Sequence, residues 1–102
     1  MHRFPGNFAI KVHPGDVLRE MLDEIHLSQA ELARHLNVDP SKINEICRRK
    51  RGISAEMAVL LGRAFNVSPG TWLNLQKNWE LSQVKPSVAK RTKPLAILAG
   101  RG

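Results

Sequence analysis

Residues 27–51, LSQAELARHLNVDPSKINEICRRKR, predict two short helices joined by a tight turn. Ser28 opens an SQAE capping box, in which the serine and the glutamate three residues later each accept a hydrogen bond from the other's amide. Asn37 tolerates the left-handed conformation that ends a helix. Asp39 is then a second N-cap, and Pro40 follows at the first helical position, where its missing N–H is not needed. Two N-caps so close together leave almost no loop between the helices.

The second of these helices, expected from residue 40 to about residue 49, separates its side chains by face. Apolar residues recur at helical spacing and point into a core: Ile43, Ile46 and Cys47. Polar and basic residues occupy the opposite face: Ser41, Lys42, Asn44, Glu45, Arg48 and Arg49. Such a face suits a helix that reads the DNA major groove, and a merely solvated helix has the same pattern. The basic run directly after it, residues 48–51, favours the DNA-reading interpretation.

The chain resembles the XRE (lambda-repressor-like) helix-turn-helix superfamily, in which LSQxELA opens the first helix of the motif. More narrowly, three segments resemble the HigA/VapI antitoxins: HPGDVLREMLDEIHLSQAELARHL at 13–36, ISAEMAVLLGRAFNVSP at 53–69 and WLNLQ at 72–76. The resemblance covers roughly residues 13–82. It implies an all-α, five-helix, lambda-repressor-like DNA-binding domain with the helix-turn-helix at about 28–50.

The resemblance also implies partners and a mechanism. The expected form is a homodimer that binds a palindromic operator in its own promoter, with double-stranded DNA and a RelE/HigB-like, mRNA-cleaving toxin as partners. The candidates for contacts to base edges are Ser41, Lys42, Asn44 and Glu45. The candidates for contacts to phosphates are Gln29, Arg48, Arg49, Lys50 and Arg51. Two recognition helices of a dimer would enter successive major grooves about 34 Å apart.

Length and composition set outer bounds. The chain has 102 residues, of which 42% are hydrophobic, and this allows one domain with a modest core. No apolar run approaches membrane-spanning length and the start MHRFPGNF lacks the apolar stretch of a signal peptide, so we expect a cytoplasmic protein. A net charge of +7 favours a polyanionic partner, nucleic acid before membrane. The first thirty residues are acidic, whereas residues 42–51 and 85–101 are basic.

Three further helices are predicted around the motif. The HPG segment is interpreted as a break, with Asp16 as the N-cap of the first helix. Ser54 is the expected N-cap of the fourth helix. Ser68 and Pro69 repeat the cap-plus-proline pattern and start a fifth helix, which runs to about residue 82.

The fifth helix carries Trp72, Leu75 and Trp79 on one face. Such a stripe is most often core. Because the other four helices already offer enough apolar surface for a small core, part of this stripe is also our candidate for a two-fold dimer interface.

The two ends of the chain form separate segments. Residues 1–12 are an N-terminal arm with a possible short strand at 8–12, residues 13–84 are the helix-turn-helix domain, and residues 85–102 are expected to be a basic, mobile tail. The tail ends in LAILAG, an apolar run that can dock on its own domain, pair as a strand, or bind another protein.

Catalysis and metal binding find little support in the sequence. The four His residues show no metal-ligand spacing, no Gly-rich phosphate loop is present, and Cys47 is interpreted as a small core residue. We therefore expect no active site, no metal and no cofactor. The alternatives to an antitoxin are a solitary XRE-type regulator without a toxin, a helical protein-interaction adaptor, and, from charge alone, an RNA-binding protein.

Overall fold

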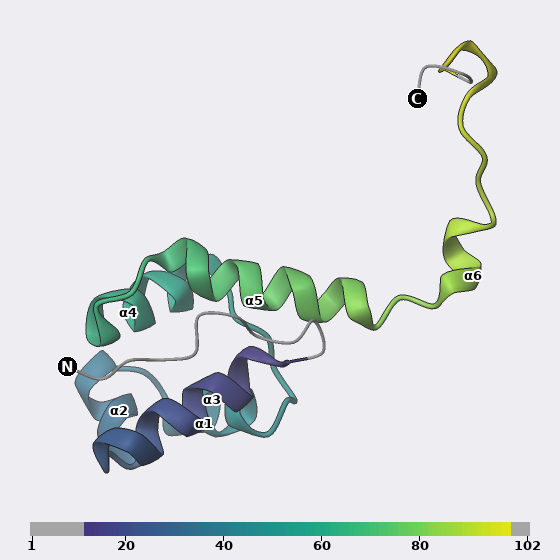
Figure 1. Ribbon diagram of the computed structural model, residues 1–102. Coiled ribbons are helices and arrows are strands. Elements are labelled where there is room, and N and C mark those ends of the chain that lie inside the picture. The colour runs from purple at the N-terminus through teal and green to yellow at the C-terminus, as the bar shows by residue number, and fades with distance from the viewer. Residues whose placement is uncertain (1–11, 99–102) are drawn as a thin grey trace.

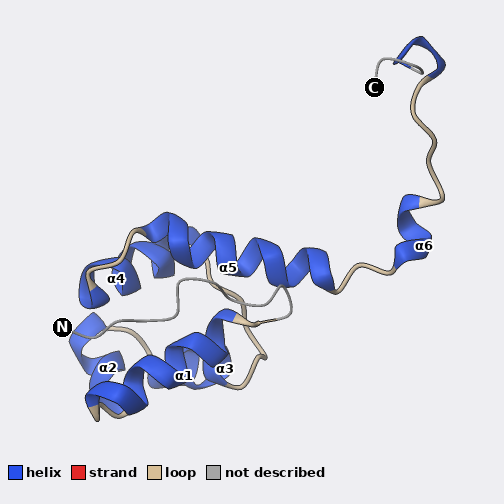
Figure 2. Ribbon diagram, in the orientation of Figure 1, coloured by secondary structure: helices blue, strands red, loops and turns tan. Residues whose placement is uncertain are grey.

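The computed structural model describes residues 12–98, and this part of the chain is entirely helical (Figure 1, Figure 2). The elements are α1 (Pro14–Ile25), α2 (Gln29–Leu36), α3 (Pro40–Cys47), α4 (Ala55–Phe65), α5 (Pro69–Ser82), α6 (Pro86–Ala89) and the 3₁₀ helix η1 (Ala96–Leu98). The all-α class is confirmed, whereas the count of five helices is not. The extra element is the single turn α6, which starts at a proline in the first helical position, a signal that the sequence analysis did not use.

Helices α2, α3, α4 and α5 begin at the expected N-caps, Ser28, Asp39, Ser54 and Ser68, and α2 ends at the expected residue. The capping box at Ser28 forms, with reciprocal hydrogen bonds of 3.0 and 3.1 Å between Ser28 and Glu31. Asp39 Oδ1 accepts from the amide of Ser41 at 2.9 Å. Asn37 ends α2 with a φ of 57°, in the left-handed region. The turn between α2 and α3 is therefore fixed by adjacent side chains alone.

The start of α1 differs from the expectation. His13, not Asp16, is the N-cap, because its ring Nδ1 accepts from the amide of Gly15 at 2.8 Å. Pro14 occupies the first helical position and Asp16 the third, from where its carboxylate accepts from the amide of His13 at 3.1 Å. The HPG segment is thus the beginning of a helix and not a break before one.

One hydrophobic core joins the first five helices. Its members are Val17, Leu18, Met21, Leu22, Leu32, Ala33, Ile43, Ile46, Cys47, Ile53, Met57, Ala58, Leu61, Trp72 and Leu75. The helices pack mainly as the pairs α4 with α5, α2 with α3, and α1 with α3. Burial raises the pKa of the Cys47 thiol to about 11, which fits the expected core role. None of the described helices has the length and hydrophobicity needed to cross a membrane.

The tentative dimer stripe is corrected by this packing. Trp72 is 1% exposed and Leu75 is 7% exposed within a single chain. Neither side chain can contact a second copy unless the fold opens, because each already fills the core between α4 and α5. Trp79 is half-buried and lies against the start of α1, where its ring meets that of His13 edge to face at 5.2 Å.

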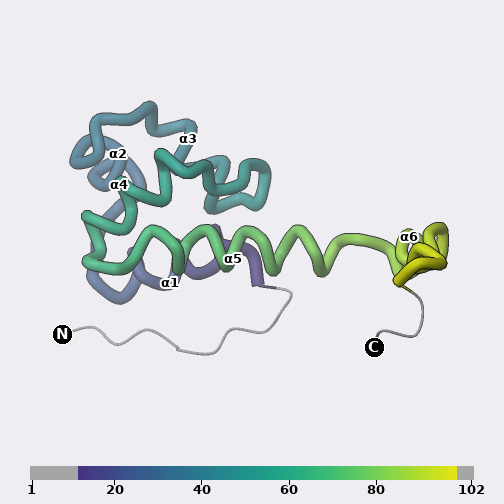
Figure 3. Tube along the Cα trace, turned by 90° about the horizontal axis from the view of Figure 1, so that it is seen from above, coloured from purple at the N-terminus to yellow at the C-terminus, as the bar shows by residue number. Residues whose placement is uncertain are grey.

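The tail leaves the body at the far end of α5. Figure 3 shows α6 beyond the C-terminal end of α5, clear of the other helices. All described residues after residue 82 are exposed, including Leu95, Ile97 and Leu98 of the apolar run. In the described part of that run, residues 95–98, the side chains do not dock on the domain, and residues 96–98 form a 3₁₀ turn and not a strand. The possible strand at 8–12 falls outside the described residues except for Val12.

Candidate nucleic-acid interface

Helices α2 and α3 form the expected helix-turn-helix. α3 buries Ile43, Ile46 and Cys47, so its opposite face is turned to solvent. On that face Asn44 Nδ2 donates a hydrogen bond of 3.2 Å to Oε1 of Gln29, the first residue of α2. This bond orients the Asn44 amide while leaving its carbonyl oxygen and second N–H free for another polar group. The structure therefore brings together two of the sequence-predicted contacts, one from each helix.

The side chains at the two ends of this surface are charged. Lys42 and Ser41 are exposed in the first turn of α3. Glu45 is partly buried and pairs with Arg51 at 3.5 Å, which holds the arginine beside the helix. Lys42 and Arg51 also line a small cavity of about 130 Å³ between α3 and the start of α4. Glu56 lines the same cavity, so the two cations there face an acidic side chain as well.

The helix ends earlier than expected, and this changes the basic run. α3 stops at Cys47, Arg48 is its C-cap, and Arg49 has a φ of 62°, in the left-handed region. The reversal sends successive side chains of the run in different directions. All four basic residues are exposed, but Arg49 alone turns back toward α1 and α5, while Arg48, Lys50 and Arg51 lie at the edge of the helix-turn-helix.

Arg49 is the candidate contact that the structure engages elsewhere. Its Nε and Nη2 donate to the two carboxylate oxygens of Asp16 at 3.0 and 2.7 Å, and its guanidinium lies 5.1 Å from the ring centroid of Trp79. The side-chain hydrogen bond from Arg49 to Asp16 raises the pKa of the arginine. Burial acts to raise the pKa of Asp16, but hydrogen bonds from Arg49, the backbone of His13 and Arg19 outweigh it and lower that pKa. Arg49 is thus paired with the carboxylate of Asp16 within the chain, and half of its side chain is exposed.

His13 completes this junction of α1, α3 and α5. Its side chain is 2% exposed, capping α1 on one side and packing on Trp79 on the other. Burial lowers the pKa of His13; the charge of Arg49 adds to the effect and that of Asp16 opposes it. A protonated ring would lose the Nδ1 lone pair that caps Gly15.

Two further residues hold the end of α3 and the following loop in place, on the side away from the exposed face of α3. Gln76 of α5 accepts a hydrogen bond of 2.8 Å at Oε1 from the amide of Ile53, in the loop between α3 and α4. Gly15 lets the start of α1 approach the end of α3, since a Cβ at this position would lie 1.8 Å from the carbonyl oxygen of Ile46. Sequence reasoning missed both roles. The only available signals were their positions in HPG and WLNLQ.

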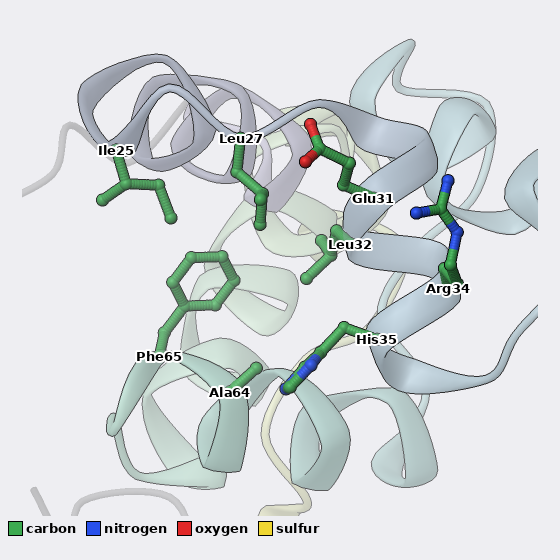
Figure 4. Close-up of a pocket in the computed structure, with 8 residues that line it drawn as sticks. All are labelled: Ile25, Leu27, Glu31, Leu32, Arg34, His35, Ala64 and Phe65. Carbon is green, nitrogen blue, oxygen red and sulfur yellow. The ribbon is translucent and has the colours of Figure 1, made fainter.

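A larger hollow lies apart from this surface. It measures about 400 Å³ and is lined by residues of α1, α2, α4 and the loop between α1 and α2: Ile25, Leu27, Glu31, Leu32, Arg34, His35, Ala64 and Phe65. Figure 4 shows Ile25, Leu27 and Phe65 turned toward one another across it. None of the candidate DNA contacts lines the hollow. Among the described residues no group of His, Cys, Asp and Glu is arranged to hold a metal.

Comparisons with known proteins match both the fold and this surface. The profile of the helix-turn-helix family matches residues 18–72. Virulence-associated protein I of Dichelobacter nodosus is 44% identical over 75 residues, which make up 72% of this chain and 69% of that protein. Antitoxin HigA of Pseudomonas aeruginosa, solved with the higBA promoter, is 42% identical with a TM-score of 0.77, over 83% of this chain and 98% of that chain. The chain belongs to the XRE-type helix-turn-helix family and is of the HigA/VapI type.

A second solved complex matches a larger share of this HigA/VapI-type chain. Antitoxin GraA in complex with its operator is 34% identical with a TM-score of 0.76, over 93% of this chain and 99% of that chain. The family match contains every candidate DNA contact, from Gln29 to Arg51. The HPG and WLNLQ segments have structural roles in the HigA/VapI-type fold. HPG starts α1 against the end of α3, and WLNLQ supplies the core residue Trp72 and the Gln76 hydrogen bond.

Proposed function

We propose that this protein is an operator-binding transcriptional repressor that regulates its own promoter, and that it acts as the antitoxin of a HigBA-type module. The observation that carries the proposal is the exposed Gln29–Asn44 pair on a helix-turn-helix whose solved relatives were captured on promoter or operator DNA. An amide pair of this kind offers both a donor and an acceptor to a base edge. The protein is proposed to work as a regulator and not as an enzyme.

We assign different tasks to the residues of the interface. Asn44, with Ser41, Lys42 and Glu45, reads base edges in the major groove. Gln29 orients Asn44 and contacts the backbone. Phosphate contacts come from Arg48, Lys50 and Arg51, which are exposed and basic. Arg49 positions the end of α3 through Asp16 and Trp79 and is removed from the phosphate set.

The test is a titration of the purified full-length protein against its own promoter fragment and a random duplex of equal length. Specific binders typically prefer their site by roughly 10³-fold or more at physiological salt. A preference of that size supports the repressor, and equal, weak binding to both duplexes contradicts it. Asn44→Ala is the matched variant, because its side chain is exposed and its removal leaves the core intact.

Dimerisation is assigned to the distal end of α5 and to α6. Leu81 is 63% exposed, Val84 is 50% exposed and Val88 is 40% exposed, and all three lie where the chain projects from the body. Exposed apolar side chains at the end of α5, in the following loop and in α6 are suited to self-association, and a two-fold dimer would present two copies of α3 to a palindrome. Leu81→Glu should convert the dimer to a monomer in light scattering. Asn78→Glu, an exposed change on the same helix, should leave the dimer intact.

The proposal of a toxin partner is based on the family to which the chain belongs. Co-purification of the protein with the product of the adjacent gene tests it, and inhibition of that product's mRNA cleavage tests the antitoxin role. A neighbouring protein that is neither retained nor inhibited would leave a solitary XRE-type regulator. Such a regulator would still bind its operator but would have no toxin partner.

A further inference from the structure

The charge of this protein is divided unevenly between its folded body and its tail. All nine Asp and Glu residues of the chain lie within residues 16–80, and Lys and Arg residues in the same span match them in number. The body therefore has no net charge, and the excess of +7 comes from the two ends. Residues 83–102 contain no acidic residue and five basic ones: Lys85, Lys90, Arg91, Lys93 and Arg101.

The four tail cations that the structure describes are exposed, and no ion pair among the described residues involves them: Lys85, Lys90, Arg91 and Lys93. Every residue from 83 to 98 is exposed, and α6 lies beyond the end of α5 (Figure 3). Each ion pair found among the described residues joins side chains of the body, at Asp16 or Glu45. A polyanion that meets the tail therefore displaces only water and counterions.

We propose that the four described cations of the tail form a second DNA contact, which binds backbone phosphates without reading the base sequence: Lys85, Lys90, Arg91 and Lys93. This inference rests on the proposed function and adds to it. Residues 16–80 have no net charge and offer DNA the basic edge of α3, so phosphate contacts from the tail would add to the counterion release that drives non-specific binding. A membrane is the less suitable partner, because α6 has four residues and η1 has three, too few to form an interfacial amphipathic helix.

Counterion release gives the size of the effect. Each phosphate neutralised on B-DNA contributes about 0.9 to the slope of log K against log salt. Replacing Arg91 and Lys93 should therefore reduce the slope by about 1.8 for each bound chain, if both side chains contact phosphates. Over a fourfold rise in salt, that difference corresponds to roughly a tenfold smaller loss of affinity per chain.

The experiment compares two double variants of the full-length protein on one random duplex over a series of salt concentrations. The tail variant is Arg91→Gln with Lys93→Gln. The control is Arg63→Gln with Lys77→Gln, which removes the same two charge types from exposed positions of α4 and α5. The tail variant should show the reduced slope, and the control should keep the wild-type slope. Equal slopes for the tail variant and the wild type, or an equal reduction in both variants, would overturn the inference.

A second arm uses the promoter fragment. The tail variant should lose affinity for promoter and random DNA by the same factor and should keep the oligomeric state of the wild type. A loss confined to the promoter, or a change in oligomeric state, would overturn a sequence-independent contact. The two proposals fail separately: a wild-type protein without promoter preference contradicts the repressor, whereas the tail is judged from the salt slope on random DNA.

Discussion

Replacing Gly15 by alanine should destabilise the protein, although alanine is the better helix former. Gly15 is the second residue of α1 and is buried where the start of α1 crosses the end of α3. A Cβ built on it lies 1.8 Å from the carbonyl oxygen of Ile46 and 2.7 Å from the carbonyl carbon. Both atoms belong to the backbone, so no side-chain rotation relieves the overlap. The two helices must move apart.

The magnitude follows from two opposing effects. Helix propensity favours alanine by at most about 1 kcal/mol. The contact must open from 1.8 Å to at least the 3.4 Å of an ordinary van der Waals contact, which shifts α1 against α3. Overpacking of this kind costs about 1–3 kcal/mol and occasionally more. We therefore expect a net loss of about 1–2 kcal/mol, which lowers the Tm of a domain of this size by roughly 4–16 °C.

Thermal and urea unfolding measure this change, and Gly70 supplies the matched control. Gly70 is likewise the second residue of its helix, α5, and follows a proline, but a Cβ there would meet only Ser68 Oγ at 3.5 Å. Gly70→Ala should therefore leave the Tm unchanged or raise it. If Gly15→Ala raised the Tm in the same way, the close approach of α1 to α3 would be refuted, because propensity alone would then decide both results.

Asn44→Ala should cost roughly 1–3 kcal/mol of operator binding and relax discrimination at one base pair; equal losses on operator and random DNA would remove Asn44 from the base-reading set. Asp16→Ala should lower the free energy of unfolding by about 1–3 kcal/mol. A double-mutant cycle should show a smaller loss from the same change in an Arg49→Ala background. Strict additivity of the two losses would mean that the two side chains do not interact. Stability should also fall as pH drops below 6.5, the ordinary histidine pKa, because the unfolded chain then binds a proton that buried His13 resists at its lowered pKa. His13→Asn keeps a capping oxygen and does not titrate, so urea unfolding between pH 7.5 and pH 5 should show a shallower slope; an unchanged slope would place the pH dependence elsewhere.

Much of the interface was predictable because its signals are local. The capping box at Ser28, the left-handed Asn37 and the cap at Asp39 each involve side chains and amides within a few residues of one another. These contacts define the turn between α2 and α3 through residues that are close in the sequence. The face of α3 then follows from helical spacing, and Ile43 and Ile46 are buried as expected. The signals that start α1 are equally local. Because the HPG segment was interpreted as a break, His13 was not predicted as the N-cap.

Two of the site assignments depend on contacts between segments far apart in the chain. Arg49 was predicted to meet phosphates from its place in a basic run, but its partner Asp16 lies 33 residues away and reaches it only because α1 crosses the end of α3. Trp72 was a candidate for the dimer interface, and only the packing of α5 on α4 places it in the core.

The sequence by itself determined where helices start and stop in the helix-turn-helix, which side chains face solvent there, and where the excess charge lies. The reason is that caps, helical periodicity and net charge are properties of short stretches of chain. Only the tertiary structure decided which exposed cation is already paired, which apolar stripe is core, and which backbone segments approach so closely that Gly15 is required. Those outcomes depend on which distant element passes over a residue, and helical spacing within one segment carries no information about that.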